Sequence, residues 1–306
     1  MGRQLLKVPA VIATAAVIAA CGGPAATPPD PGPASEPPQP PPRTSWALGH
    51  RLPTSQNLRI VAQRIGFYDE STGVTLGRTT DGTDVECYVT VSVPGWGGPD
   101  NMVGEKIPTR VQGHPGYRSG KGAEGDYLMW RAAGDKWVMT SCQPPGGQRS
   151  ISLVAAAVRM QKSSIAVPFG LRALPDGWGI ASVSDDRNQN TTKVFVGRSP
   201  LPARGLPESE IEISYEGGAD PLHKPSGRNL TVNGRPALLD ETPRSPSLCV
   251  LVQGRHVCIS SSLDDTGPYP DRSAEVPVLI AIAENLVFAK NLADRSTWLP
   301  AERVLG

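Results

Sequence analysis

The chain has 306 residues, with 30 Lys and Arg against 29 Asp and Glu, so its formal net charge at pH 7 is +1. Residues 1–20 hold two positive charges and no negative ones; without them the balance is 28 against 29, which argues against nucleic acid or another polyanion as a partner. The 33 glycines and 32 prolines, with 5% aromatic residues, favour many turns and short strands over long helices.

The first twenty residues have the regions of an export signal. Arg3 and Lys7 form a short positive region, and the 13 uncharged residues 8–20 are too few to cross a bilayer core of about 30 Å as a stable helix. The stretch Ile18-Ala19-Ala20-Cys21 then places two small residues before a cysteine. We expect residues 1–20 to be a signal peptide. The alternative is a plain secretory signal in which the cysteine occurs by chance.

These four residues resemble the lipobox of bacterial prolipoproteins, of the actinobacterial type. The resemblance implies that signal peptidase II recognises Ile18, Ala19 and Ala20, and that Cys21 becomes the first residue of the mature protein, carrying a diacylglyceryl group and an N-acyl group such as palmitate. It implies a lipid anchor on the extracytoplasmic face of the cell membrane. Two acyl chains anchor stably, at about 0.8 kcal/mol per buried methylene.

A proline-rich segment follows the cysteine. Residues 22–43 contain ten prolines with small and polar residues between them, and almost nothing to bury. Such a segment favours a polyproline-type spacer of about 3.1 Å per residue, which holds a globular part away from the membrane. We therefore expect the lipidated cysteine and a disordered linker to span residues 21–45. A proline-rich ligand for a partner domain is the alternative reading.

Beyond the linker the chain repeats short motifs at nearly constant spacing. Three pairs of similar stretches are offset by 120 to 122 residues: 49–53 with 170–175, 74–78 with 194–198, and 111–115 with 232–236. A constant offset predicts two tandem domains of ordinary single-domain size, at residues 46–163 and 164–293, followed by a tail at 294–306.

Each half shows the same order of local signals. Alternating apolar residues predict strands at residues 84–93 and 209–215, and a Val-x-Gly-x-Pro turn and a hairpin follow. Apolar stripes with helical spacing then predict helices at residues 150–161 and 275–292. We therefore expect an α+β fold of two repeats, each an antiparallel sheet packed by a C-terminal helix. A lipid-facing or partner-facing stripe is the alternative for these helices.

Four cysteines remain after Cys21, and an even number in an exported chain predicts two disulfides. If Gln253-Gly254 is a two-residue turn, Cys249 and Cys258 stand directly opposite each other on a hairpin. Cys87 is then left to pair with Cys142, and each bridge stays within its own half. Two other connectivities exist. The spacing contains no CxxC, so we expect no metal site.

The opening of the second half carries a resemblance at the level of the domain. Residues 169–178 read Phe-Gly-Leu-Arg-Ala-Leu-Pro-Asp-Gly-Trp, and the half closes with the apolar residues 279–286. This order, with meandering strands and a Val-x-Gly-x-Pro turn, is similar to PsbP-like domains, which include actinobacterial envelope lipoproteins. The first half lacks the Gly-Trp. In architecture and compartment the chain also resembles LolA/LolB-like carriers, which hold acyl chains inside a curved sheet. Neither resemblance implies a catalytic residue.

Catalytic motifs are absent from the sequence. No G-x-S-x-G elbow occurs, and no two histidines have HxH or HxxxH spacing. We expect all four histidines to lie at the surface or in loops: His50, His114, His223 and His256.

Two acidic pairs and three aromatic residues are the remaining candidates for a metal site or a groove. Asp185-Asp186 and Asp264-Asp265 lack the calcium-loop frame, so we expect solvated turns. Trp130, Trp137 and Tyr127 either pack between sheet and helix, which we prefer, or line a groove.

The sequence thus predicts a non-catalytic extracytoplasmic binding or accessory module, without cofactor, whose partner is an envelope protein or ligand. One alternative is a carrier of hydrophobic ligands, which requires a deep apolar cavity between sheet and helix. The other is an envelope hydrolase, which requires an acid, a base and a nucleophile to converge in one cleft.

Overall fold

The computed structural model describes residues 45–55, 57–78, 84–94, 97–102, 104–120, 126–143, 147–198, 210–217, 227–262 and 271–305. The predicted signal peptide lies outside the described residues, and so does the predicted linker except for residue 45. The residues outside the described ranges include the predicted lipobox residues Ile18, Ala19, Ala20 and Cys21. Among the described residues, no helix is long and apolar enough to cross a membrane.

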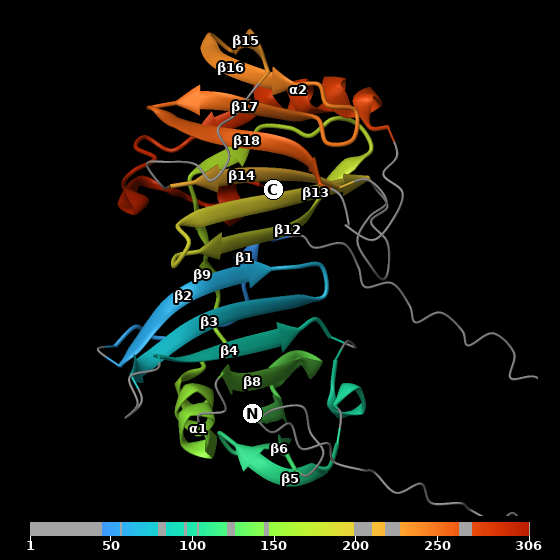
Figure 1. Cartoon of the computed structure of the whole chain (residues 1–306). Helices are drawn as coiled ribbons and strands as arrows, with labels where there is room; N and C mark the ends of the chain where they lie inside the picture. Colours follow the sequence, from blue (N-terminus) through green and yellow to red (C-terminus); the bar gives the residue numbers. More distant parts are fainter. Residues whose placement is uncertain are drawn as a thin grey trace, which may run out of the picture. The chain divides into compact units, whose positions relative to one another are not determined.

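Fourteen of the described strands form one antiparallel sheet (Figure 1). The strand order is β15-β16-β17-β18-β14-β13-β12-β2-β3-β4-β8-β7-β6-β5. The bounds are β2 Leu58–Ile65, β3 Asp69–Arg78, β4 Asp84–Ser92, β5 Lys106–Val111, β6 His114–Ser119, β7 Tyr127–Arg131, β8 Trp137–Gln143, β12 Trp178–Asp186, β13 Thr191–Arg198, β14 Glu210–Glu216, β15 Arg228–Val232, β16 Arg235–Asp240, β17 Ser247–Val252 and β18 Arg255–Ser262.

The sheet is joined at its centre by β2 and β12, which we call the seam. Four residue pairs form it, from Ile65 opposite Val183 to Ala62 opposite Asp186. Counted outward from the seam, the seven strands on each side have the same order. The first three follow the chain (β2-β3-β4 and β12-β13-β14), and the other four run in reverse chain order (β8-β7-β6-β5 and β18-β17-β16-β15). The hairpins next to the seam each carry a register shift, between Ile60 and Ala62 and, 120 residues later, between Ile180 and Ser182.

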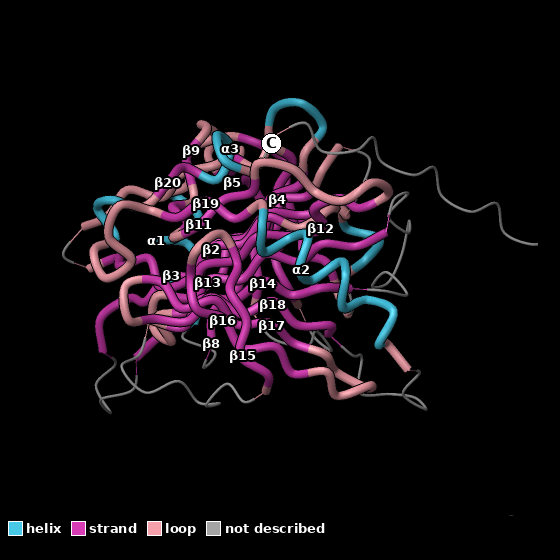
Figure 2. The backbone as a smooth tube through the Cα atoms, turned by 90° about the horizontal axis from the view of Figure 1, so that it is seen from above, coloured by secondary structure: helices cyan, strands magenta, loops and turns pink. Residues whose placement is uncertain are grey.

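Short elements cover one face of this sheet. The helix α1 (Gly147–Ala157) contacts β4, β7 and β8, whereas α2 (Val276–Glu284) contacts β15, β17 and β18. In Figure 2 the helix α3 (Ala301–Val304) lies among the short strand pairs, on one side of the long strands. These pairs are β1 (Ala47–Leu48) with β9 (Ser163–Ser164), β10 (Ala166–Val167) with β20 (Leu299–Pro300), and β11 (Phe169–Leu171) with β19 (Leu286–Phe288). The 3-10 turns are η1 Pro99–Asn101, η2 Ala133–Asp135, η3 Ser273–Glu275 and η4 Arg295–Thr297.

The covered face is apolar because side chains alternate along each strand. In β4, Val85, Cys87, Val89 and Val91 are at most 4% exposed, and the residues between them are half-buried or exposed. The buried side chains form two clusters. One joins β4, β7 and β8 to α1, and the other joins the strands from the seam to β15 with α2 and the C-terminal segment. Burial of these side chains, at about 25 cal/mol per Å² of apolar surface, is the main stabilising contribution.

The expected fold class is wrong. The described residues are mostly β, with 55% in strands and 16% in helices, and the described α-helices have only 11, 9 and 4 residues. A continuous sheet replaces the two separate sheets, each packed by a C-terminal helix, that the sequence analysis expects. The error arises because the pairing of β2 with β12 joins residues about 120 positions apart, and neither strand carries a local sign of that partner.

The second predicted helix is also shorter than expected. It ends at Glu284 instead of reaching residue 292, and Asn285 caps it. The next three residues form β19, which pairs with β11 through Phe169 opposite Phe288. Since backbone groups of β19 bond to another strand, they cannot continue the helical ladder. Residues 286–292 keep their apolar pattern but bury it as strand and loop.

The Val-x-Gly-x-Pro turns hold the helices to the sheet. Gln112, in the β5–β6 turn, donates its side-chain amide to the carbonyl of Ala155 at 2.7 Å, near the end of α1. Asn233, in the β15–β16 turn, donates in the same way to the carbonyl of Glu284 at 2.6 Å, at the end of α2. Both residues have positive φ, 50° and 47°. The shared motif therefore encodes a turn whose amide satisfies helix carbonyls that have no partner within the helix.

Replacing Asn233 by Ala is expected to lower the free energy of unfolding by about 1 to 2 kcal/mol, because it removes this bond and places a Cβ-bearing residue without local hydrogen bonding at positive φ. Asn233→Gly is the matched control, since glycine tolerates the backbone but lacks the amide. Urea unfolding followed by circular dichroism measures both. If neither variant loses stability, the amide does not hold α2.

Candidate functional site

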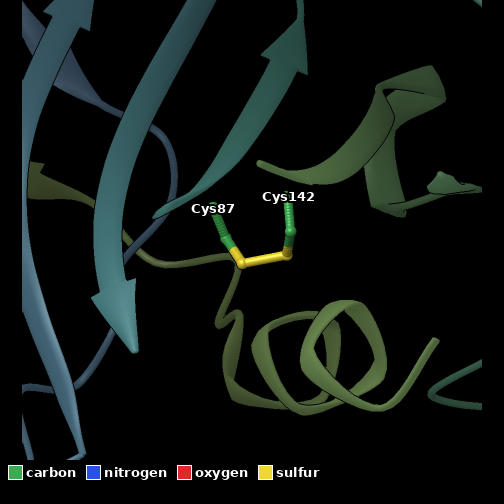
Figure 3. Close-up of a disulfide and its surroundings, with 2 residues drawn as sticks. All are labelled: Cys87 and Cys142. Carbon is green, nitrogen blue, oxygen red and sulfur yellow. A yellow bond between two sulfur atoms is a disulfide. The ribbon is translucent and has the colours of Figure 1, made fainter. Parts of the chain in front are cut away.

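The predicted disulfides are both present, and they lie on opposite faces of the sheet. Cys87 on β4 and Cys142 on β8 are 0% and 3% exposed, and their disulfide lies in the buried cluster beside α1 (Figure 3). Cys249 on β17 pairs with Cys258 on β18 directly across the hairpin, in the register that the Gln253-Gly254 turn predicts. Neighbouring Leu248 and Val250 point into the core, so this second disulfide lies on the other face.

A histidine, an acid and a hydroxyl do converge next to the seam. His50 Nε2 lies 2.9 Å from Thr72 Oγ1, and His50 Nδ1 lies 3.5 Å from Glu70 Oε2. Glu70 and Thr72 are alternate residues of β3 and so share its buried face. Glu70 also accepts a hydrogen bond from the backbone of Gly49. The order acid, imidazole, hydroxyl is the one that nucleophilic catalysis uses.

Burial rules out that use in this structure. His50, Glu70 and Thr72 are 0%, 4% and 1% exposed, so no substrate reaches the hydroxyl. The cluster instead fastens the segment that precedes β2 onto β3. Of the four histidines expected at the surface or in loops, His50 does lie in a loop, after β1, but it is fully buried. His114 is exposed, His256 is half-buried, and His223 lies outside the described residues.

A second buried polar cluster surrounds Asp185, which was expected in a solvated turn. Asp185 is 1% exposed, and Arg295 Nη1 donates to both of its carboxylate oxygens, at 3.0 and 2.8 Å. Thr192 donates to the same carboxylate at 3.2 Å, and Arg187 approaches it at 3.4 Å. Asp186 behaves as expected: it is half-buried and accepts bonds from two backbone N–H groups of the turn. The other predicted pair, Asp264-Asp265, lies outside the described residues.

This cluster fixes the C-terminal segment to the sheet. The Arg295 guanidinium lies 4.3 Å from the centre of the Trp298 ring, and Trp298 packs edge-on against Tyr215 of β14. The Tyr215 hydroxyl and the Trp298 indole both donate to the carbonyl of Leu292, at 2.8 and 3.2 Å. The arginines are thus occupied with structural bonds. The expected tail at residues 294–306 is integrated into the fold as far as it is described.

The three aromatic residues singled out in the sequence separate in space. Trp130 is 2% exposed and packs in the cluster beneath α1. Val138 lies opposite Trp130 and so shares its face of the sheet. Trp137, which directly precedes Val138 in β8, therefore faces the other side, where its ring centre is 6.5 Å from that of Tyr117. Tyr127 lines a cleft, and burial raises the pKa of its phenol.

That cleft is the candidate binding site. It lies where β5, β6 and β7 meet α1 at one end of the sheet, and its volume is about 260 Å³. Seven of its nine lining residues have polar side chains, namely Thr109, Arg110, Arg118, Ser119, Asp126, Tyr127 and Ser152, and the other two are Leu128 and Ile151. Arg110 and Ser152 are exposed, so the cleft is reached from solvent.

A glycine in β6 brings the lining strands together. A Cβ at Gly116 would lie 2.3 Å from the backbone oxygen of Met129 and 2.9 Å from Trp130 Cβ. Glycine therefore allows β6 to approach β7 at the point where only three residue pairs join them. The last of these pairs is Arg118 opposite Leu128, and from there on the cleft is lined by Arg118 and Ser119 on β6 and by Asp126 just before β7.

Apolar side chains of the helices cluster with those of the sheet beneath them. Ile151, Val154 and Ala155 of α1 are at most 2% exposed and belong to one cluster with Cys87 and Trp130. In α2, a similar set is buried against β17 and β18: Leu279, Ile282 and Ala283. Both helices therefore bury their apolar side chains against the sheet.

No group of three or more His, Cys, Asp or Glu side chains within the described ranges is placed to hold a metal ion. Of the cleft's residues, the sequence pointed only to Tyr127, through the alternative that it lines a groove, because the other residues come from three strands and a helix. The signal available was the pair Arg118-Ser119 beside the aromatic Tyr127.

No protein-family model matches the chain, and a search of the curated proteins also finds no match.

Proposed function

We propose that the chain is a lipid-anchored extracytoplasmic protein of the cell envelope that acts as a non-catalytic binding module. The observation that carries the binding role is the polar cleft at the β5–β7 end, which solvent reaches. By contrast, the acid, imidazole and hydroxyl of the buried cluster next to the seam are closed off. A protein with an open polar cleft and closed catalytic groups is suited to hold a ligand without transforming it.

The anchor follows from the lipobox resemblance of residues 18–21 and from the prolines of residues 22–43. A spacer of about 22 residues at roughly 3.1 Å each reaches up to about 70 Å when fully extended. Such a length places a cleft beyond the immediate membrane surface, where solutes and other envelope components are accessible.

Cys21→Ser is expected to abolish lipidation and to release the protein from the membrane, or to leave an unprocessed precursor, because the cysteine sulfur receives the diacylglyceryl group. Labelling with a radioactive fatty acid, followed by membrane fractionation, measures this. Ser35→Ala, in the proline-rich segment, is the matched control and should label normally. Incorporation of fatty acid into the Cys21→Ser protein would refute the anchor.

The binding role is tested by a photo-crosslinking amino acid at Ser152, on the rim of the cleft, and at Arg59, an exposed position on β2, as control. In living cells the Ser152 probe should capture a species that the Arg59 probe does not. Absence of any adduct, or identical adducts from both positions, would contradict a binding role for the cleft.

A further inference from the structure

The charges of the cleft select its ligand. Two guanidinium groups, of Arg110 and Arg118, line it against one carboxylate, of Asp126, so the lining carries a net positive charge. Within the described part of the chain, no acidic group lies within ion-pair distance of Arg118, although it is half-buried on the covered face of β6. A partly desolvated arginine without a counter-ion favours an oxyanion, because its planar donors match two oxygens of a carboxylate or phosphate.

Neutral donors stand beside this arginine. Ser119 Oγ accepts a hydrogen bond from the backbone N–H of Tyr127 at 3.1 Å, which leaves its hydroxyl proton for another acceptor. Arg110 donates through Nη1 to the carbonyl of Gly113 at 2.9 Å, and most of its N–H groups remain. The hydroxyls of Thr109 and Ser152 complete a lining dominated by donors.

The remaining acid makes the site more specific than a simple anion site. Asp126 only accepts hydrogen bonds when ionised, so it repels a bare anion and favours a ligand that also carries hydroxyl groups. The size of the cleft sets a further limit. About 260 Å³ corresponds to roughly nine water volumes of ~30 Å³ each, enough for a monosaccharide-sized or glycerol-sized molecule.

We propose that the cleft binds a small polyhydroxylated oxyanion, a sugar acid or a sugar or glycerol phosphate, with its anionic group on Arg118 and its hydroxyls on Asp126. The inference rests on the proposed binding function and names its ligand class. The same chemistry occurs in a free solute and in the headgroup of a glycerophospholipid.

Titration calorimetry of the full chain in detergent micelles tests the proposal, with glucuronate and glycerol 3-phosphate as probes and glucose and glycerol as uncharged controls. At least one charged probe should bind saturably, and Arg118→Gln should weaken it by about ten- to a hundredfold, the loss of a charged hydrogen-bonding pair. Arg131→Gln is the matched control. Arg131 lies on the adjacent strand, is 55% exposed and pairs with Asp135, so its loss should change binding less than twofold.

Arg118→Lys covers the case in which the Gln variant fails to fold, and it should retain charge but bind more weakly, because lysine cannot engage two oxygens at once. If phosphatidylglycerol displaces glycerol 3-phosphate and phosphatidylcholine does not, the natural ligand is a lipid headgroup. If phosphatidylglycerol does not displace it, the natural ligand is a free solute. Both results support the ligand class.

The ligand class is overturned if no charged probe binds, if glucose binds as tightly as glucuronate, or if Arg118→Gln and Arg131→Gln weaken binding equally. If the calorimetry gives one of these results but the Ser152 probe still captures a specific species, the cleft binds a ligand of another class and the proposed binding function stands. Loss of capture at Ser152 overturns the binding function itself.

Discussion

Replacement of both Cys87 and Cys142 by Ala is expected to lower the free energy of unfolding by about 4 kcal/mol. The disulfide joins residues 55 apart in sequence, and in the chain-entropy model a loop of that length restricts the unfolded chain by about this amount. Both cysteines are also buried against α1, so truncation leaves space in the cluster. Guanidinium unfolding monitored by circular dichroism, with and without reductant, measures the loss.

Two comparisons isolate the cross-link. Val at both positions keeps apolar volume, so the difference between the Val and Ala pairs reports packing alone. Cys249→Ala with Cys258→Ala opens a bridge between residues only 9 apart, on the other face of the sheet, and should cost about 3 kcal/mol or less. A larger loss from this second pair would contradict the account based on loop length and burial.

The register of a hairpin, and the disulfide that follows from it, could be predicted from the sequence. The Gln253-Gly254 turn has φ values of 53° and 74°, as a two-residue hairpin turn requires, and the turn alone sets which residues face each other across β17 and β18. The pairing of Cys249 with Cys258 follows from that register. Such features are predictable because everything that determines them lies within about ten residues.

Pairing between distant strands was not predictable in the same way. The seam between β2 and β12 and the pairing of β11 with β19 each join segments more than a hundred residues apart. An apolar stretch such as residues 286–288 satisfies a helical pattern and a strand pattern equally well, and only the presence of β11 decides between them. The error in fold class and the excess helix length have this common cause.

Buried polar residues were the other gap, although the sequence carried a signal for one of them. Asp185 follows Val183 by two residues, so in a strand both side chains share a face, and a charged group there must be paired. His50 lies in the loop after β1, which ends at Leu48, so alternation gives no such signal for it. Alternation thus indicated the burial of Asp185, whereas the partners Arg295 and Glu70 could only come from the structure.

Replacement of Arg295 by Leu is expected to destabilise the protein by about 3 kcal/mol, because it leaves the carboxylate of Asp185 buried with weaker partners. Breaking one side of a buried ion pair costs about 3 to 5 kcal/mol, and the lower end applies because Arg187 still approaches the same carboxylate at 3.4 Å. Amide hydrogen exchange should also rise in residues 291–305, since Arg295 ties that segment to β12.

Arg187→Gln is the matched control, because it removes the more distant of the two arginines from the same carboxylate. Its side chain is 39% exposed, so we expect a loss of about 1 kcal/mol or less and no change in exchange near Trp298. The double variant Asp185→Leu with Arg295→Leu removes the buried charge together with its partner. It should lose less stability than Arg295→Leu alone, since no unpaired carboxylate remains. If the double variant is instead less stable than Arg295→Leu alone, Asp185 owes its place at the seam to its hydrogen bond with Thr192 and not to the arginine.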